Sequence, residues 1–417
     1  MIPAHLCISC KGRLWCKLPS CPILERFNVK TQAVSSIKGN VFEGSSPPGV
    51  FVSWTDYPNV SIAPMAPPVV SADNAVMDDP EGWFGLPPDE IVSYRSRLIQ
   101  AQSKSKVHQA SNPGQQLGAM QEIAMSAKPV AAEFRLSRPP VASLSFHEGV
   151  APTGPSAPLV HLELSENPSI PTKVDYLVSD TDAKSTIAVQ ELYEKDFSVH
   201  YLTKLLSAGT LGIGRNRKLV PTRWSITAID SNVSAYLVDE FVKDHPELGG
   251  IELFFASYLD NRFFVLLVPR AWSFEMMECW LPGSAWTLED PAAQKADAFH
   301  IIADHEFFDG RTSYADRITG AYYAARLAVA EYLVRQKRQA AAVVFREIGQ
   351  GYAVPLGVWV IRETMRKALE SKPMAFSDLP LALQYVAARS TAPFALYKKE
   401  SKLIPFLTQQ RRLSEFA

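Results

Sequence analysis

Two apolar segments separated by a short polar one place the strongest constraint on the fold of this chain. Residues 251–259 and 263–268 are apolar almost throughout, and Asp260-Asn261-Arg262 between them is typical of a turn joining antiparallel strands. A strand with one solvated face alternates polar and apolar residues, and these two segments do not. The sequence therefore predicts a β-hairpin at the centre of a sheet that is covered on both faces.

Helices and further strands are predicted on both sides of this hairpin. Amphipathic spacing indicates long helices at 183–207 and 313–339, and shorter helices at 89–100, 121–129 and 356–372. Strands are predicted at 50–54, 60–62, 144–146, 160–164, 173–178, 224–229 and 341–348. We expect irregular structure at 22–50 and a polar surface loop at 103–118. The fold class that follows is α+β (mixed).

The length of 417 residues suits two or three domains. We expect an N-terminal zinc knuckle (1–25), a large α+β domain with a central sheet (26–289), a mainly helical C-terminal domain (290–400) and a flexible C-terminal peptide (401–417). The net charge of −1 excludes a uniformly cationic surface, so nucleic acid would have to bind to a local patch. No apolar run is long enough for a membrane span and no signal peptide is evident, so we expect a cytoplasmic protein.

Four of the five cysteines lie within the first 21 residues, with the spacing C-x2-C-x5-C-x4-C. The cysteines are Cys7, Cys10, Cys16 and Cys21. Four thiolates can close a tetrahedron around zinc, and the metal would supply the folding energy that so short a segment lacks. An iron–sulfur site and a redox pair are alternatives, but the inner spacings are too long for the usual iron–sulfur run. We expect structural zinc, with cations and Trp15 between the ligands available to nucleic acid.

A glycine-rich basic stretch begins at Gly209. Its glycines and cations are Gly209, Gly212, Gly214, Arg215, Arg217, Lys218 and Arg223. Glycines permit a backbone with positive φ or a close approach to a ligand, and the cations suit a phosphate or polynucleotide backbone. Asp230 follows the predicted strand 224–229 and would begin a helix. The alternative is a solvated basic hairpin with no ligand.

Histidines and carboxylates are densest at the end of residues 293–306, which we interpret as a helix. Asp304, His305 and Glu306 could hold a divalent metal together, although a polar helix end explains them as well. An acidic segment at 78–85 could also bind metal, but a turn packed by Trp83 is the preferred interpretation. We expect His200, near the buried face of its helix, to be a structural histidine.

The C-terminus has the form Q-x-x-L-x-x-F. Gln410 precedes Leu413, and Leu413 and Phe416 are three residues apart, so one helical turn places both on one face. A short segment with such apolar anchors is typical of a peptide that binds a groove on a sliding clamp.

Taken together, these features resemble the archaeal Nre family of DNA-repair proteins. The resemblance is carried by the four-cysteine cluster, by the block Pro221-Thr-Arg-Trp-Ser-Ile-Thr-Ala228, by Gly320-Ala-Tyr-Tyr-Ala-Ala-Arg326 with Pro355-Leu-Gly-Val-Trp359, and by the tail. It implies a cytoplasmic repair factor that the PCNA clamp recruits to DNA, with a role in tolerance of damage such as crosslinks. It implies no reaction. Clamp peptides often end in two aromatic residues, and Ala417 here departs from that pattern, which should weaken binding.

Three functions remain open from the sequence. The preferred one is a clamp-tethered factor that binds damaged or single-stranded DNA through the zinc knuckle and the glycine-rich basic stretch. The second is an enzyme acting on nucleic acid or a nucleotide, a nuclease or a nucleotidyl or ADP-ribosyl transferase, with Arg223 and Asp230 beside its pocket and the 304–306 side chains holding a metal. The third is an adaptor whose cysteine cluster binds another protein.

Overall fold

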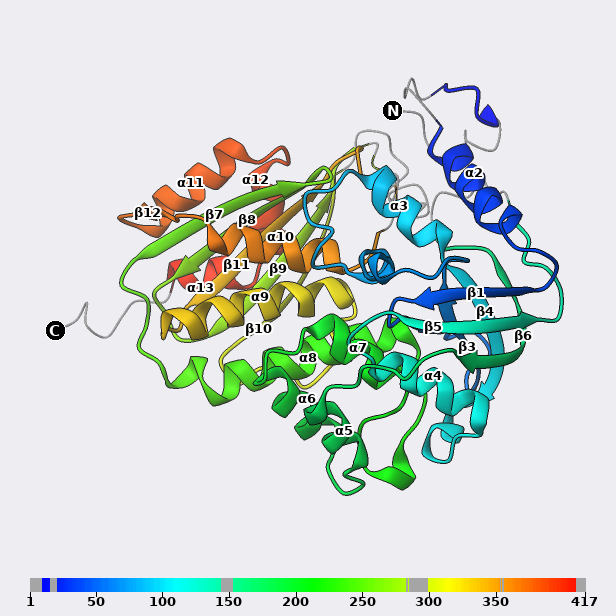
Figure 1. Cartoon of the computed structure of the whole chain (residues 1–417). Helices are drawn as coiled ribbons and strands as arrows, with labels where there is room; N and C mark the ends of the chain where they lie inside the picture. Colours follow the sequence, from blue (N-terminus) through cyan, green and yellow to red (C-terminus); the bar gives the residue numbers. More distant parts are fainter. Residues whose placement is uncertain are drawn as a thin grey trace. The chain divides into compact units, whose positions relative to one another are not determined.

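A computed structural model describes residues 10–15, 21–143, 153–282, 284, 299–352, 354 and 356–409. These residues form two compact units, here called the first unit (up to Val233) and the second unit (from Ser234), and the division falls inside one helix (Figure 1). Each unit has a six-stranded sheet with helices packed on it. The predicted α+β class is confirmed, but the sequence did not reveal that the protein has two sheets. The predicted domain boundaries stay a prediction.

The sheet of the first unit curls around an apolar core. Its strands are β1 (Val41–Ser46), β2 (Val50–Val52), β3 (Asn59–Ala66), β4 (Ile99–Lys106), β5 (Val130–Leu136) and β6 (Ser156–Leu164), in the order β1-β5-β6-β4-β3-β2. All neighbours are antiparallel except β4 and β6. The N–H of Ser45 in β1 donates to the carbonyl of Val69, 3.1 Å away, so the chain after β3 returns to the other edge of the sheet.

The first unit also contains helices, one of which contributes to the core of this sheet. They are α2 (Pro22–Ser35), α3 (Pro88–Arg97), α4 (Gln115–Met125), α5 (Thr172–Ser179), α6 (Ser185–Tyr193), α7 (Val199–Ser207) and α8 (Thr222–Glu240), with the 3-10 turns η1 (Ala72–Asp78), η2 (Val107–Ser111) and η3 (Gly214–Asn216). Met120 and Ile123 of α4 are buried with Phe134 of β5 in the core cluster. The helix predicted at 183–207 is broken into α6 and α7, because Asp196 has a positive φ and Ser198 caps α7.

Several local predictions for the first unit were wrong. Residues 224–229, predicted as a strand, lie in α8, and residues 173–178 lie in α5; a proline just before each segment suits a helix start. Residues 22–50 contain α2 and β1, and residues 103–118 contain the end of β4, η2 and the start of α4. Short apolar runs without clear alternation do not distinguish strand from helix. The strand predicted at 144–146 lies outside the described residues.

The second unit confirms the predicted central hairpin. Its strands are β7 (Ile251–Tyr258), β8 (Asn261–Val268), β9 (Ser273–Trp280), β10 (His300–Glu306), β11 (Ala341–Ile348) and β12 (Met374–Phe376), in the order β10-β9-β11-β8-β7-β12. Tyr258 pairs with Asn261, and Leu259 and Asp260 between them both have positive φ, as a tight hairpin turn requires. The strand predicted at 341–348 is β11, and every one of its residues is buried.

Helices cover both faces of this sheet, as the apolar strands predicted. Figure 1 shows α9 (Gly320–Gln336) and α10 (Trp359–Glu370) on one face and α11 (Leu379–Arg389), α12 (Phe394–Glu400) and α13 (Leu403–Gln409) on the other. On the second face, Phe345 of β11 packs against the rings of Phe394 and Tyr397. Cys279, predicted to be a core residue, is buried there, and burial raises the pKa of its thiol to about 12.

No helix in the described part of the chain is long and apolar enough to cross a membrane.

Two buried carboxylates attach the outer helices to the sheet. Glu347 of β11 accepts hydrogen bonds from the backbone N–H groups of Thr391 and Ala392 (2.7 and 2.9 Å), just before α12. Glu275 of β9 accepts them from Lys402 and Leu403 (2.6 and 3.3 Å), at the start of α13. Glu275 thereby satisfies N–H groups that the start of α13 leaves without partners within the helix, whereas Glu347 binds the segment that joins α11 to α12.

Candidate nucleic-acid interface

The glycines of the basic stretch allow the chain to pack against itself. Gly209 and Gly212 have φ of +69° and +107°, whereas Gly214 begins η3 without a positive φ. A Cβ atom on Gly209 would lie 2.6 Å from the carbonyl oxygen of Lys218, so no larger residue fits there. The backbone conformation and packing of the first unit therefore explain why Gly209 and Gly212 are glycines, without a ligand.

Arg217 is the cation that holds this stretch in place. Its Nε donates to the carbonyl of Gly212 (2.8 Å), and its Nη2 donates to the carbonyls of Val178 (2.7 Å) and Asp180 (3.0 Å) at the end of α5. Burial lowers the pKa of the Arg217 guanidinium, and the nearby Asp180 carboxylate opposes that shift. The side chain is thus directed inward.

Arg215, Lys218 and Arg223 are placed differently, because all three are exposed. Within the described residues, none of the three side chains makes an ion pair or hydrogen bond. The N–H of Leu219 donates to the carbonyl of Val107 (2.8 Å), which brings Lys218 to the end of β4, where Lys106 is also exposed. The first unit therefore presents a local cationic patch on a chain whose net charge is −1.

Two aromatic rings of the first unit are also exposed, and one of them belongs to Trp224, the residue after Arg223 in the sequence. Trp224 at the start of α8 and Tyr57 in the β2–β3 loop are 46% and 48% exposed, and their ring centroids are 5.1 Å apart at an interplanar angle of 53°. Trp54, in the same loop as Tyr57, is also exposed. We call Tyr57, Trp224, Arg215, Lys218 and Arg223 the aromatic–cationic surface.

Hydrogen bonds fix the two segments that carry the rings. The N–H of Val52 in β2 donates to Thr222 Oγ1 (2.9 Å), which ties the start of α8 to the strand before the Tyr57 loop. The hydroxyl of Ser207 lies 3.0 Å from the same oxygen. The N–H of Val107 donates to the carbonyl of Pro58 (3.0 Å), which holds the other side of the loop. This arrangement could not be predicted with Trp224 assigned to a strand, although the aromatic residues of the turn at 54–59 were visible in the sequence.

Asp230, predicted beside Arg223, lies two turns further along α8. Residues seven apart share one side of a helix, so the two side chains leave α8 in similar directions. Arg223 is exposed and Asp230 is buried. Asp230 lies inside the helix and does not begin it, which corrects the predicted helix cap.

The acidic cluster of the second unit lies on β10, where a helix was predicted. Successive residues of a strand point to opposite faces, so His305 faces away from Asp304 and Glu306. Glu306 accepts hydrogen bonds from Trp272 Nε1 (3.0 Å), Tyr322 Oη (3.0 Å) and Arg326 Nη1 (2.8 Å).

Asp304 is also engaged with neighbouring groups. It accepts from the backbone N–H of Ile318 (2.8 Å) and pairs with Arg311 (3.3 Å). Burial, and then the charge of Arg311, lower the pKa of His305. The strand thus separates His305 from Asp304 and Glu306, which the predicted helix end would have gathered with it, and both carboxylates already have internal donors.

Two of the four clustered cysteines, Cys10 and Cys21, lie within the described residues, and zinc binding by the cluster stays a prediction. Cys10 is buried, and the N–H of Trp15 donates to its Sγ (3.5 Å) across a turn in which Lys11, Gly12 and Leu14 have positive φ. Cys21 directly precedes α2. Cys7 and Cys16 lie outside the described residues.

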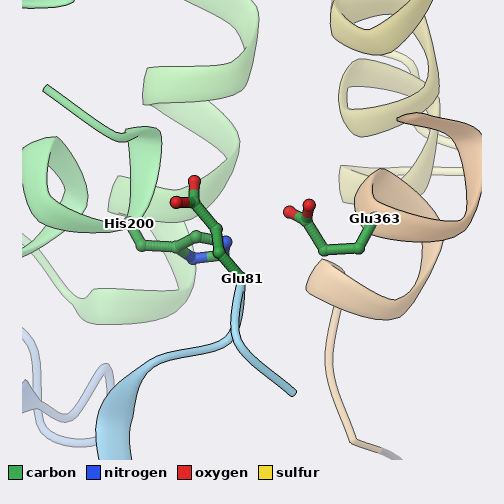
Figure 2. Close-up of side chains that lie close together, drawn as sticks. All are labelled: Glu81, His200 and Glu363. Carbon is green, nitrogen blue, oxygen red and sulfur yellow. The ribbon is translucent and has the colours of Figure 1, made fainter. Parts of the chain in front are cut away.

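Glu81 and His200 of the first unit lie side by side in Figure 2, with ligand atoms within 4.8 Å of each other. The 78–85 segment is a turn packed by buried Trp83, as predicted, and His200 is on α7. One imidazole and one carboxylate are too few ligands to define a metal site. Glu363, also labelled in Figure 2, belongs to α10 of the second unit, where it pairs with Arg366 (3.3 Å).

The clamp-peptide residues Gln410, Leu413 and Phe416 lie outside the described residues, which end at Gln409, the last residue of α13.

The contrast between Arg217 and Arg215 leads to a testable prediction. Replacing Arg217 with Met removes three hydrogen bonds to carbonyl groups and should lower the free energy of unfolding by about 2–3 kcal/mol in a urea titration. The matched control, Arg215→Met, should change it by less than about 0.5 kcal/mol, because that side chain is exposed. Equal stabilities for the two variants would contradict the structural role of Arg217.

Comparisons with known proteins show which family the chain belongs to. Sequence models described as archaeal Nre, N-terminal and archaeal Nre, C-terminal match residues 15–287 and 306–416. The chain is 36% identical over 410 residues to DNA repair protein NreB of Archaeoglobus fulgidus, covering 98% of this chain and 99% of that protein. It is 35% identical over 342 residues to DNA repair protein NreA of Haloferax volcanii, covering 81% and 80%. No solved structure matches it. The two matches together span most of the sequence, and the chain therefore belongs to the archaeal Nre family.

Proposed function

We propose that this protein is a cytoplasmic DNA-repair factor that the PCNA clamp recruits and that binds damaged or single-stranded DNA through its aromatic–cationic surface and its zinc knuckle. The observation that carries the proposal is that Arg215, Lys218 and Arg223 are exposed in the segment that leads into and begins α8, and that the exposed ring of Trp224 at the start of that helix has its centroid 5.1 Å from that of Tyr57. Cations without internal partners are available for phosphate groups, and exposed rings are available for bases. The printed names of the relatives as DNA repair proteins support the same function.

The cysteine cluster adds a second contact in this proposal. Cys7, Cys10, Cys16 and Cys21 would bind one zinc ion, which stabilises the short N-terminal segment. The buried position of Cys10 and its N–H···S contact support a structural metal. Lys11, Arg13 and Trp15 in the turn after Cys10 would then be held where they can contact DNA.

The C-terminal peptide compensates for a modest affinity of the cationic patch. An attachment to the clamp raises the effective concentration of the repair factor at DNA, so that a few phosphate contacts are enough. Gln410, Leu413 and Phe416 would enter the clamp groove.

Reversing the charges of the patch tests DNA binding. Arg215→Glu, Lys218→Glu and Arg223→Glu together should weaken binding to a single-stranded oligonucleotide and reduce the slope of log K against log salt by about 2, at about 0.7 per lost phosphate contact. Fluorescence anisotropy over a salt series measures both. The control reverses the exposed Lys128, Arg138 and Lys195, which produces the same change in net charge. An unchanged slope in the patch variant would refute DNA binding at this surface.

Elemental analysis tests the metal. The purified protein should contain one zinc per chain, and Cys10→Ser should lose most of it and destabilise the N-terminal segment. Cys279→Ser serves as the control, because Cys279 lies in the core of the second unit. Equal zinc content in the two variants, or iron in place of zinc, would contradict the knuckle.

Removing the tail tests recruitment. A chain that ends at Gln409 should lose binding to PCNA in isothermal titration while its affinity for isolated DNA is unchanged. Leu413→Ala with Phe416→Ala in the full chain should reproduce the loss, since these are the two apolar anchors. Clamp binding that survives both changes would show that the tail is not the attachment.

A further inference from the structure

We propose that Tyr57 and Trp224 form a stacking platform for an unpaired base, so that the aromatic–cationic surface selects single-stranded over duplex DNA. This inference rests on the proposed function and names the feature of DNA that the site recognises. The glycine-rich basic stretch alone would bind any polyanion. The two rings are what could distinguish one form of DNA from another.

The two rings leave aromatic surface available to a ligand. Their planes are inclined by 53° at a centroid distance of 5.1 Å, and about half of each side chain is exposed. The pair Phe42 and Phe134 in the core of the first unit shows the opposite arrangement, with rings parallel within 5° at 4.7 Å and both side chains buried. The core pair is shielded from water, whereas the inclined pair lies at the surface with about half of each residue exposed.

The platform is held in position before any ligand binds. Trp224 lies on the first turn of α8, which the Val52–Thr222 hydrogen bond ties to β2. Tyr57 lies in a loop closed by the Asn59 N–H donating to the Asp56 carbonyl (2.8 Å) and by the ion pair of Asp56 with Lys104 (2.7 Å). An aromatic ring that is already oriented loses little conformational entropy when a base stacks on it, so more of the stacking energy contributes to affinity.

The chemistry favours an unpaired base as the occupant. Every base has a π face, so stacking tolerates any sequence, and the cations at Arg215, Lys218 and Arg223 can follow a flexible phosphate backbone. In a duplex each base face is covered by its neighbours, so a ring on a protein surface reaches it only after unstacking, which costs a few kilocalories per mole. An apolar protein partner would gain little from exposed cations such as Arg223, the residue before Trp224.

The test compares two forms of the same DNA sequence. Trp224→Ala should weaken binding to a single-stranded oligonucleotide by roughly 5- to 150-fold, the range measured for loss of one stacked base, and leave binding to the duplex nearly unchanged. Trp224→Phe, which keeps a ring, should restore most of the affinity. Tyr57→Ala should have the same direction of effect. Oligonucleotide binding should also quench tryptophan fluorescence less in Trp224→Phe than in the wild type.

Tyr314→Ala is the matched control, because Tyr314 is 50% exposed, contacts the ring of Tyr323, and belongs to the second unit. Urea titrations establish that each variant is folded. An equal loss on single-stranded and duplex DNA, or no loss in Trp224→Ala, would overturn the platform.

Failure of the platform and failure of the proposed function give different results. If Trp224→Ala binds single strands as the wild type does while the triple charge reversal still lowers the salt slope, DNA binding stands and base stacking is refuted. If neither variant changes DNA binding, the proposed function itself fails at this surface, and a protein partner becomes the better occupant of the exposed rings.

Discussion

The central strands β8 and β11 of the second unit have no solvent-exposed face, and this constraint determines what packs around them. All residues of β11 are buried, and β8 has a single residue that is not. Such strands are stable only between two layers, which here are α9 with α10 and α11 to α13. The polar groups that must enter this interior are satisfied locally, as Glu275 is by N–H groups at the start of α13 and Glu347 by those of the segment before α12.

The buried acidic residues of β10 are therefore part of the interior of the second unit. Glu306 receives three donors and Asp304 receives two backbone N–H groups and Arg311. A buried carboxylate without such partners would destabilise the fold. These contacts therefore account for Asp304 and Glu306 as structural residues. The same reasoning separates Arg217 from Arg215 in the first unit. Arg217 satisfies carbonyl groups, whereas Arg215 does not and remains available to a ligand.

In the first unit a rigid framework carries the exposed groups. The curled sheet and α4 form the core, and the candidate interface is built from a loop, a 3-10 turn and the beginning of α8. Segments of this kind can expose aromatic and cationic side chains without disturbing the core. Hydrogen bonds from Val52 to Thr222 and from Val107 to Pro58 attach the start of α8 and the Tyr57 loop to this framework.

Local patterns in the sequence determined the hairpin at Asp260, the buried strand β11, the turn at Trp83 and the candidate ligands Cys7, Cys10, Cys16 and Cys21, because hydrophobic run length, turn residues and cysteine spacing act over a few residues. Only the tertiary structure decided that residues 224–229 are helical and residues 300–306 are a strand, since short apolar runs suit either form until their neighbours are known. It also decided which arginine faces inward and that Tyr57 meets Trp224. Those outcomes depend on hydrogen bonds and ring contacts between segments distant in the chain, which no local pattern encodes.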